Sequence, residues 1–112
     1  MAIKIVQSPV GPAGQVTLPE RIEVAQILRS TKLSEKVVIE YHLPPASGLR
    51  FEGKGEAVQR EETIARADTP LHHRLEVERA TGSGALRVTI DERILDPEGQ
   101  SLQVTSFDLF VI

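Results

Sequence analysis

Three histidines, His42, His72 and His73, are the residues of this sequence best suited to hold a metal ion, because neutral imidazoles bind zinc and copper. His72 and His73 are adjacent in a segment with strand periodicity. Their side chains therefore point to opposite faces and do not reach the same ion. A site made of His42 and one of them, with Glu40 or Asp68 added, stays geometrically open. We favour structural histidines and predict no metal site.

Two pairs of adjacent carboxylates, Glu61-Glu62 and Asp91-Glu92, are the candidates for general acid and base chemistry. Glycoside hydrolysis needs two carboxyl groups that face each other across a cleft at about 5 to 10 Å. Neighbouring residues on a strand face opposite sides of the sheet, so adjacent acids do not meet this requirement. We interpret both pairs as solvated charge.

The short glycine motifs also lack the context that chemistry requires. Gly82-Ser83-Gly84 has neither the spacing nor the following helix of a nucleophile elbow, and we interpret it as a turn. Gly11 and Gly14 do not join a strand to a helix, as a phosphate-binding loop would. We therefore predict no catalytic residue, no cofactor and no enzymatic activity.

Composition and net charge exclude several kinds of site and several classes of partner. The 112 residues fit a single domain, 1–112, and contain no cysteine, which excludes disulfides, thiolate metal sites and a cysteine nucleophile. The net charge is −3 and basic residues alternate with acidic ones, which disfavours nucleic acid as a partner.

No apolar run approaches the roughly 20 residues that span a bilayer, so we predict no membrane insertion. The first residues, Met1-Ala2-Ile3-Lys4, lack the basic segment followed by an apolar segment that is typical of a signal peptide. We expect a cytoplasmic protein, or alternatively a domain excised from an exported one.

The clearest structural signal is alternation of apolar and polar residues with a period of two, which predicts half-buried strands. It is strong in segments 35–43, 71–77 and 86–94. Residues 81–84 are of the types that favour turns, so we predict that segments 71–77 and 86–94 form a hairpin. Asp96-Pro97-Glu98-Gly99 predicts a tight turn into a final strand, 101–112.

The stretch 15–31 is ambiguous, because Thr17-Leu18-Pro19-Glu20 matches a helix capping box while the following residues alternate. As a strand it places Ile22, Val24, Gln26 and Leu28 on one face. We favour strand, since a helix here would carry only a thin apolar stripe. We expect an edge strand at residues 2–7 and another within 56–67. The total of about seven to eight strands predicts an all-β antiparallel Greek-key sandwich.

The final strand carries apolar side chains on both faces. Phe107, Leu109 and Val111 share one face, and Phe110 and Ile112 share the other. A slip in the period near Ser106 indicates a bulge there. Either residues 56–67 cover the second face, or the strand is a contact surface for a homodimer or another protein. We take Phe107, Leu109, Phe110 and Ile112 as the candidate interaction surface.

The order of features from about residue 15 onward resembles the immunoglobulin-like sandwich modules of bacterial proteins, of the NPCBM-associated and adhesin type. Residues 39–51 (IEYHLPPASGLRF) are similar to a central strand that runs through a proline-rich corner into a short crossing strand. Residues 82–90 (GSGALRVTI) and 96–99 (DPEG) are similar to a late strand pair. The resemblance implies an immunoglobulin-like β-sandwich with a binding or scaffolding role, and it implies no catalytic residue.

Taken together, the sequence predicts a non-enzymatic protein-interaction or structural scaffolding module that is able to self-associate as a homodimer. The alternative is a ligand-binding module for a carbohydrate or a metal-assisted small molecule. Carbohydrate binding is disfavoured because aromatic residues make up only 4 % of the chain. Tyr41 shares a face with Ile39 and Leu43, which predicts a core position and not a stacking platform for sugars.

Overall fold

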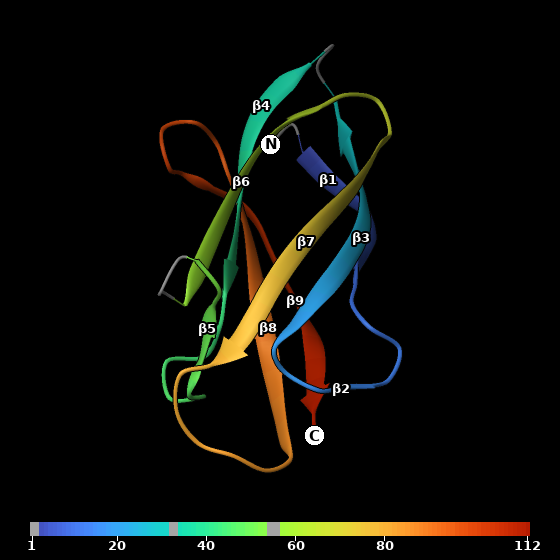
Figure 1. Ribbon diagram of the computed structural model, residues 1–112. Helices are drawn as coiled ribbons and strands as arrows, with labels where there is room; N and C mark the ends of the chain where they lie inside the picture. The colour runs from blue at the N-terminus through green and yellow to red at the C-terminus, as the bar shows by residue number, and fades with distance from the viewer. Residues whose placement is uncertain (1–2, 32–33, 54–56) are drawn as a thin grey trace.

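The computed structural model describes residues 3–31, 34–53 and 57–112, which form nine strands in two sheets. Figure 1 shows β3 and β7 side by side in one layer, with β8 and β9 in the layer behind. The strands are β1 (Ile3–Val10), β2 (Gln15–Val16), β3 (Glu20–Ser30), β4 (Glu35–His42), β5 (Leu49–Phe51), β6 (Val58–Ala65), β7 (Thr69–Arg79), β8 (Leu86–Leu95) and β9 (Ser101–Val111).

The two sheets have the orders β1-β3-β7-β5 and β2-β9-β8-β4-β6. The short β2 runs parallel to β9, and the other paired strands are antiparallel. The expectation of an all-β protein with two layers is confirmed. The described residues form more strands than the expected seven to eight, because β2 and β5 are short separate pieces of two and three residues.

The core lies between the sheets and consists mainly of Val, Ile and Leu side chains that alternate with outward polar residues. This follows from the period of two, which sends every second side chain to the same face. The fully buried aromatic side chains are Tyr41 on β4 and Phe51 on β5. Inward positions of β8 and β9 are held by Val88, Ile90, Ile94, Phe107, Leu109 and Val111.

The ambiguous stretch forms strands, as favoured above. Residues 17–19 separate β2 from β3 and carry the chain from the five-stranded sheet to the four-stranded one. Ile22, Val24, Gln26 and Leu28 of β3 are all buried on the same face, as their spacing predicted. The two expected edge strands are also found, as β1 and β6. Of the segments expected to hold them, Ala2 and Glu56 lie outside the described residues.

The predicted hairpin of segments 71–77 and 86–94 is wrong. These segments lie in β7 and β8, which belong to different sheets, so residues 80–85 cross the end of the sandwich. Two backbone N–H groups of this crossing, those of Ala80 and Thr81, donate to the carbonyl oxygen of Gly48. Gly48 has a φ of 75°, and a Cβ there would lie 2.8 Å from the Thr81 oxygen, so glycine is required. Period-two alternation identifies a buried face, but it does not identify the strand's partner.

The predicted bulge near Ser106 is also misplaced. Ile94 lies opposite Gln103 and Leu95 opposite Ser101, which makes Leu102 the extra residue, and the pairing from Gln103 to Val111 is regular. Val104 consequently faces outward and is 61 % exposed. The apparent slip in the sequence arose because this apolar residue sits on the solvent side of the sheet.

Gly11 provides a stability test of the packing between the β1–β2 connection and β9. A Cβ at Gly11 would lie 2.9 Å from the Phe107 ring, whereas a Cβ at Gly14 would meet no atom within 4 Å. We expect Gly11→Ala to lower the free energy of unfolding by about 1 to 2 kcal/mol through overpacking. Gly14→Ala should leave it unchanged or raise it by about 0.5 kcal/mol. Urea denaturation of both variants checks this, and equal effects at the two positions would contradict the described packing.

Candidate functional site

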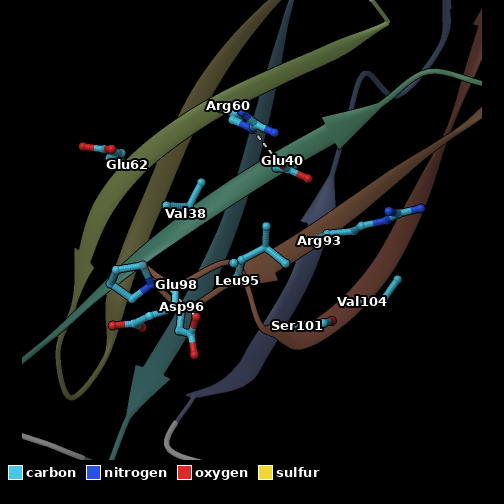
Figure 2. Close-up of a pocket in the computed structure, with 12 residues that line it drawn as sticks. Val38, Glu40, Arg60, Glu62, Arg93, Leu95, Asp96, Glu98, Ser101 and Val104 are labelled. Atoms are coloured by element: carbon cyan, nitrogen blue, oxygen red, sulfur yellow. Dashed lines mark hydrogen bonds and ion pairs between the residues drawn. The ribbon is translucent and has the colours of Figure 1, made fainter.

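A shallow groove of about 870 Å³ lies on the outer face of the five-stranded sheet. Figure 2 shows side chains of β4, β6, β8 and β9 around it, together with the turn between β8 and β9. Val38, Leu95 and Val104 supply apolar surface, and the rim carries charges of both signs. The charged lining residues are Glu40, Arg60, Glu62, Arg93, Asp96 and Glu98.

The most buried charge on this outer face is Glu40, whose residue is only 7 % exposed. Its carboxylate accepts a hydrogen bond from Arg60 Nε on the neighbouring strand β6, and its other oxygen lies 3.0 Å from His42 Nε2. Burial pushes the pKa of Glu40 upward, but the hydrogen bonds and charges of Arg60 and His42 outweigh it and hold the pKa below its ordinary value. Glu40 is therefore ionised at neutral pH and fixes the position of Arg60.

Beside the groove, β6 forms an open edge of the sheet. Its eight residues contain no proline and pair with β4 without a register shift, from Glu35 opposite Ala65 to His42 opposite Val58. The next opposed pair is Leu43 and Ala57, where Leu43 N–H donates to the Ala57 carbonyl over 2.8 Å. Hydrogen-bonded and non-bonded pairs alternate in an antiparallel ladder, so the odd-numbered residues of β6 bond to β4.

The even-numbered residues of β6 consequently direct their backbone N–H and C=O groups away from β4. These residues are Val58, Arg60, Glu62 and Ile64. Within the part of the chain that the structure describes, none of these groups has a backbone partner. The β8–β9 turn reaches this region through Pro97, but its backbone hydrogen bonds stay within the turn. Such an edge can accept a further strand.

A second polar group lies in the interior, between the sheets. Gln26 on β3 is 2 % exposed and Glu92 on β8 is 0 % exposed, and Gln26 Nε2 donates to Glu92 Oε2 over 2.6 Å. Gln26 Nε2 also lies 3.5 Å from the hydroxyl of Tyr41, which is 2.6 Å from His73 Nδ1. Residues from both sheets thus form one buried hydrogen-bonded chain.

Burial sets the protonation of this interior chain. It raises the pKa of Glu92 to about 7, although hydrogen bonds from Gln26 and Tyr41 favour the carboxylate. It lowers the pKa of His73, against the attraction of the Glu61 charge. It also raises the pKa of Tyr41, together with the negative charge of Glu92. His73 and Tyr41 are therefore uncharged at neutral pH. With Gln26 and Glu92 closed off from solvent, this cluster links the two sheets through the core.

The predicted interaction surface divides into two parts. Phe107 and Leu109 are 8 % and 1 % exposed and pack in the core, so they cannot contribute to a surface. Phe110 is 42 % exposed on the outer face of β9, and Ile112, directly after β9, is 53 % exposed. The Arg87 guanidinium lies 5.5 Å from the centre of the Phe110 ring. The described residues of segment 56–67 do not cover this face, because β8 and β4 lie between β6 and β9 in the sheet.

The structure separates the three histidines that were considered as metal ligands. His42 faces outward on β4, His73 points into the sandwich and His72 is exposed. Asp68 forms an ion pair with Arg29 at 2.8 Å. In the described ranges, no three His, Cys, Asp or Glu residues are grouped closely enough to hold a metal ion.

The paired carboxylates face apart, as predicted, but the interpretation of Glu92 as solvated charge is wrong. Asp91 and Glu62 are exposed, whereas Glu92 is fully buried and Glu61 is partly buried on the inner side of β6. Glu61 Oε1 accepts a hydrogen bond from Gln59 Nε2 over 2.8 Å. The signal for Glu92 was present in the sequence, since it shares its parity with Ile90 and Ile94.

Neither a protein-family model nor a curated protein matches this sequence. Over the described residues, the structure contains no helix long and apolar enough to cross a membrane.

Proposed function

We propose that this chain is a non-enzymatic protein-interaction module that binds an extended segment of a partner along the open edge of β6. The observation that carries the proposal is the regular, eight-residue ladder of β6 with β4, which leaves the backbone groups of Arg60 and Glu62 directed outward. Main-chain hydrogen bonds at such an edge supply affinity for an added strand.

The groove beside the edge supports the same function. Side chains of an added strand alternate between the two faces of the sheet, so every second one would lie on the grooved face. Val38 and Leu95 offer apolar contact there, and Arg60, Arg93 and Glu62 offer charges of both signs. This arrangement favours a peptide of alternating character over a flat or uniformly charged partner.

The same proposal includes an immunoglobulin-like arrangement of the sandwich. In such domains one sheet holds strands A, B, E and D and the other holds C, F and G. The orders β1-β3-β7-β5 and β9-β8-β4 support this correspondence. β6 is an additional strand beside β4, and it follows β5 in the chain. The resemblance to bacterial interaction modules agrees with a binding role for that additional edge.

Peptide selection tests the proposed function. Linear peptides displayed on phage are selected against the immobilised protein, and the enriched peptides are titrated by calorimetry against the wild type and two variants. Glu62→Pro removes an N–H that faces away from β4, so the β4–β6 ladder stays intact while the open edge is blocked. We expect Glu62→Pro to weaken peptide binding at least about 10-fold.

Glu62→Ala is the matched control, because it removes the same carboxylate but keeps the backbone donor. We expect its affinity to stay within about 3-fold of the wild type. Hydrogen exchange should show slower exchange of the Arg60 and Glu62 amides when peptide is bound. Enriched peptides that bind Glu62→Pro as tightly as the wild type would contradict strand docking at β6.

Phe110 on β9 and Ile112 directly after it give a second candidate contact surface, because both remain exposed. The edge of β6 is favoured over it, since the Arg87 side chain already lies over the Phe110 ring. A Phe110→Lys variant separates the two surfaces in the experiment below.

A further inference from the structure

We propose that β6 pairs with β6 of a second copy of this chain, antiparallel, about a twofold axis that passes through Glu61. This inference rests on the strand-docking function proposed above and names the partner. The observation behind it is the order of side chains along the open edge. The four residues with free backbone groups run apolar, positive, negative, apolar. In an antiparallel pair with a second copy, each charge therefore faces the opposite charge and each apolar side chain faces an apolar one.

The register follows from the order Val58, Arg60, Glu62 and Ile64 along β6. With the axis at Glu61, Arg60 lies opposite the partner's Glu62, and Val58 lies opposite the partner's Ile64. The symmetric copies of both pairs form at the same time. Each pair joins residues whose backbone groups face the edge, so each exchanges two N–H···O=C hydrogen bonds. Opposite charges and apolar side chains are thus matched along the whole edge.

Other registers are less favourable. Only registers that place even-numbered residues of β6 opposite one another align free donors with free acceptors. An axis at Arg60 places two guanidinium groups opposite each other and leaves Ile64 opposite no residue of β6. An axis at Glu62 opposes two carboxylates and leaves Val58 opposite no residue of β6. Like charges directly opposite across a strand pair are destabilising.

The side chains needed for these contacts are available. Ile64 is 45 % exposed, and the Arg60 side chain is 71 % exposed while Glu40 holds its Nε. Glu62 has no ion-pair partner among the described residues. Glu40 therefore positions Arg60 with its terminal nitrogens still free to meet a carboxylate from the second copy.

The inner side of the pairing has one unfavourable contact. Glu61 would lie opposite Glu61 of the second copy at the axis, and each carboxylate would keep its hydrogen bond from Gln59. Glu61 is thereby a specific marker of the register, because only this axis brings the two Glu61 side chains together.

Analytical ultracentrifugation from about 10 µM to 1 mM tests the dimer. We expect a concentration-dependent dimer for the wild type and for Phe110→Lys. Glu62→Pro should raise the dissociation constant at least about 30-fold, because both copies lose an edge donor. Circular dichroism and thermal unfolding of Glu62→Pro check that the fold is retained.

The register is tested by a gain of affinity, which misfolding does not produce. We expect Glu61→Gln to lower the dimer dissociation constant about 2- to 5-fold, since it removes the repulsion at the axis and keeps an oxygen to accept from Gln59. Glu20→Gln is the control for net charge, because Glu20 is exposed on β3 in the other sheet. It should leave the dissociation constant unchanged.

The outcomes separate this inference from the proposed function. A wild type that is monomeric over the whole range, or a dimer abolished by Phe110→Lys and not by Glu62→Pro, would overturn pairing through β6. An unchanged or weaker dimer for Glu61→Gln would overturn the register. If the wild type is monomeric but peptide binding still depends on the Glu62 N–H, only the second-copy partner fails.

Discussion

Glu92→Gln is expected to remove a pH-dependent loss of stability that the wild type carries. Glu92 is fully buried, and burial raises its pKa from the ordinary value of 4.5 to about 7. The folded state therefore binds a proton more tightly than the unfolded state does. Below pH 4.5 both states are protonated at this residue and it has no effect. Between pH 4.5 and 7 the stability falls, and above pH 7 the full loss is present.

The expected size of the effect is about 3 kcal/mol, since each unit of pKa difference corresponds to about 1.4 kcal/mol. Glutamine resembles the protonated acid and still accepts the hydrogen bond from Gln26. We expect wild type and Glu92→Gln to have similar free energies of unfolding at pH 4.5. At pH 8 the variant should be more stable by about 3 kcal/mol.

Urea denaturation of both proteins from pH 4.5 to 8 measures this difference. The lowered pKa of His73 acts in the opposite direction, because it destabilises the fold as the pH decreases. Subtracting the wild-type stability from that of the variant largely cancels this contribution. Glu98→Gln, an exposed carboxylate in the β8–β9 turn, is the control and should show a flat difference. A flat difference for Glu92→Gln as well would show that Glu92 is not held in a buried site.

Phe51→Ala is expected to cost about 3 to 5 kcal/mol of stability, as large-to-small changes of buried aromatic residues do. Phe51 belongs to the three-residue strand β5 but is 0 % exposed. Its backbone pairs with Val77 of β7, so its ring reaches the core from the edge of the four-stranded sheet. A short strand with few ladder hydrogen bonds depends on this side chain for its attachment.

The neighbouring residue provides the comparison. Arg50 faces outward and forms a 2.7 Å ion pair with Glu78. Exposed ion pairs contribute little, so Arg50→Ala should change the free energy of unfolding by less than about 1 kcal/mol. Thermal and urea unfolding of the two variants check the contrast. A loss below about 1 kcal/mol for Phe51→Ala would mean that β5 is not anchored through its ring.

Much of the interior was predictable because alternation along a strand assigns each side chain to a face. Leu71, Leu75 and Val77 are buried, as their spacing indicated. The same rule applied to Gln26 and Glu92, which share their parity with apolar neighbours. Glu92 was misjudged because a charged residue is usually exposed, and only a partner across the core makes its burial tolerable. That partner lies 66 residues away in the chain.

The amino-acid sequence by itself determined that the chain forms strands, and it identified nearly all the faces that those strands bury. This information is local, because side chains two residues apart lie on the same face of any extended segment. Strand partnership is not local. The tertiary structure decided that β7 and β8 lie in different sheets and that the bulge falls at Leu102. The physical reason is that pairing depends on how the two sheets close over their shared core, and every strand contributes to that closure at once.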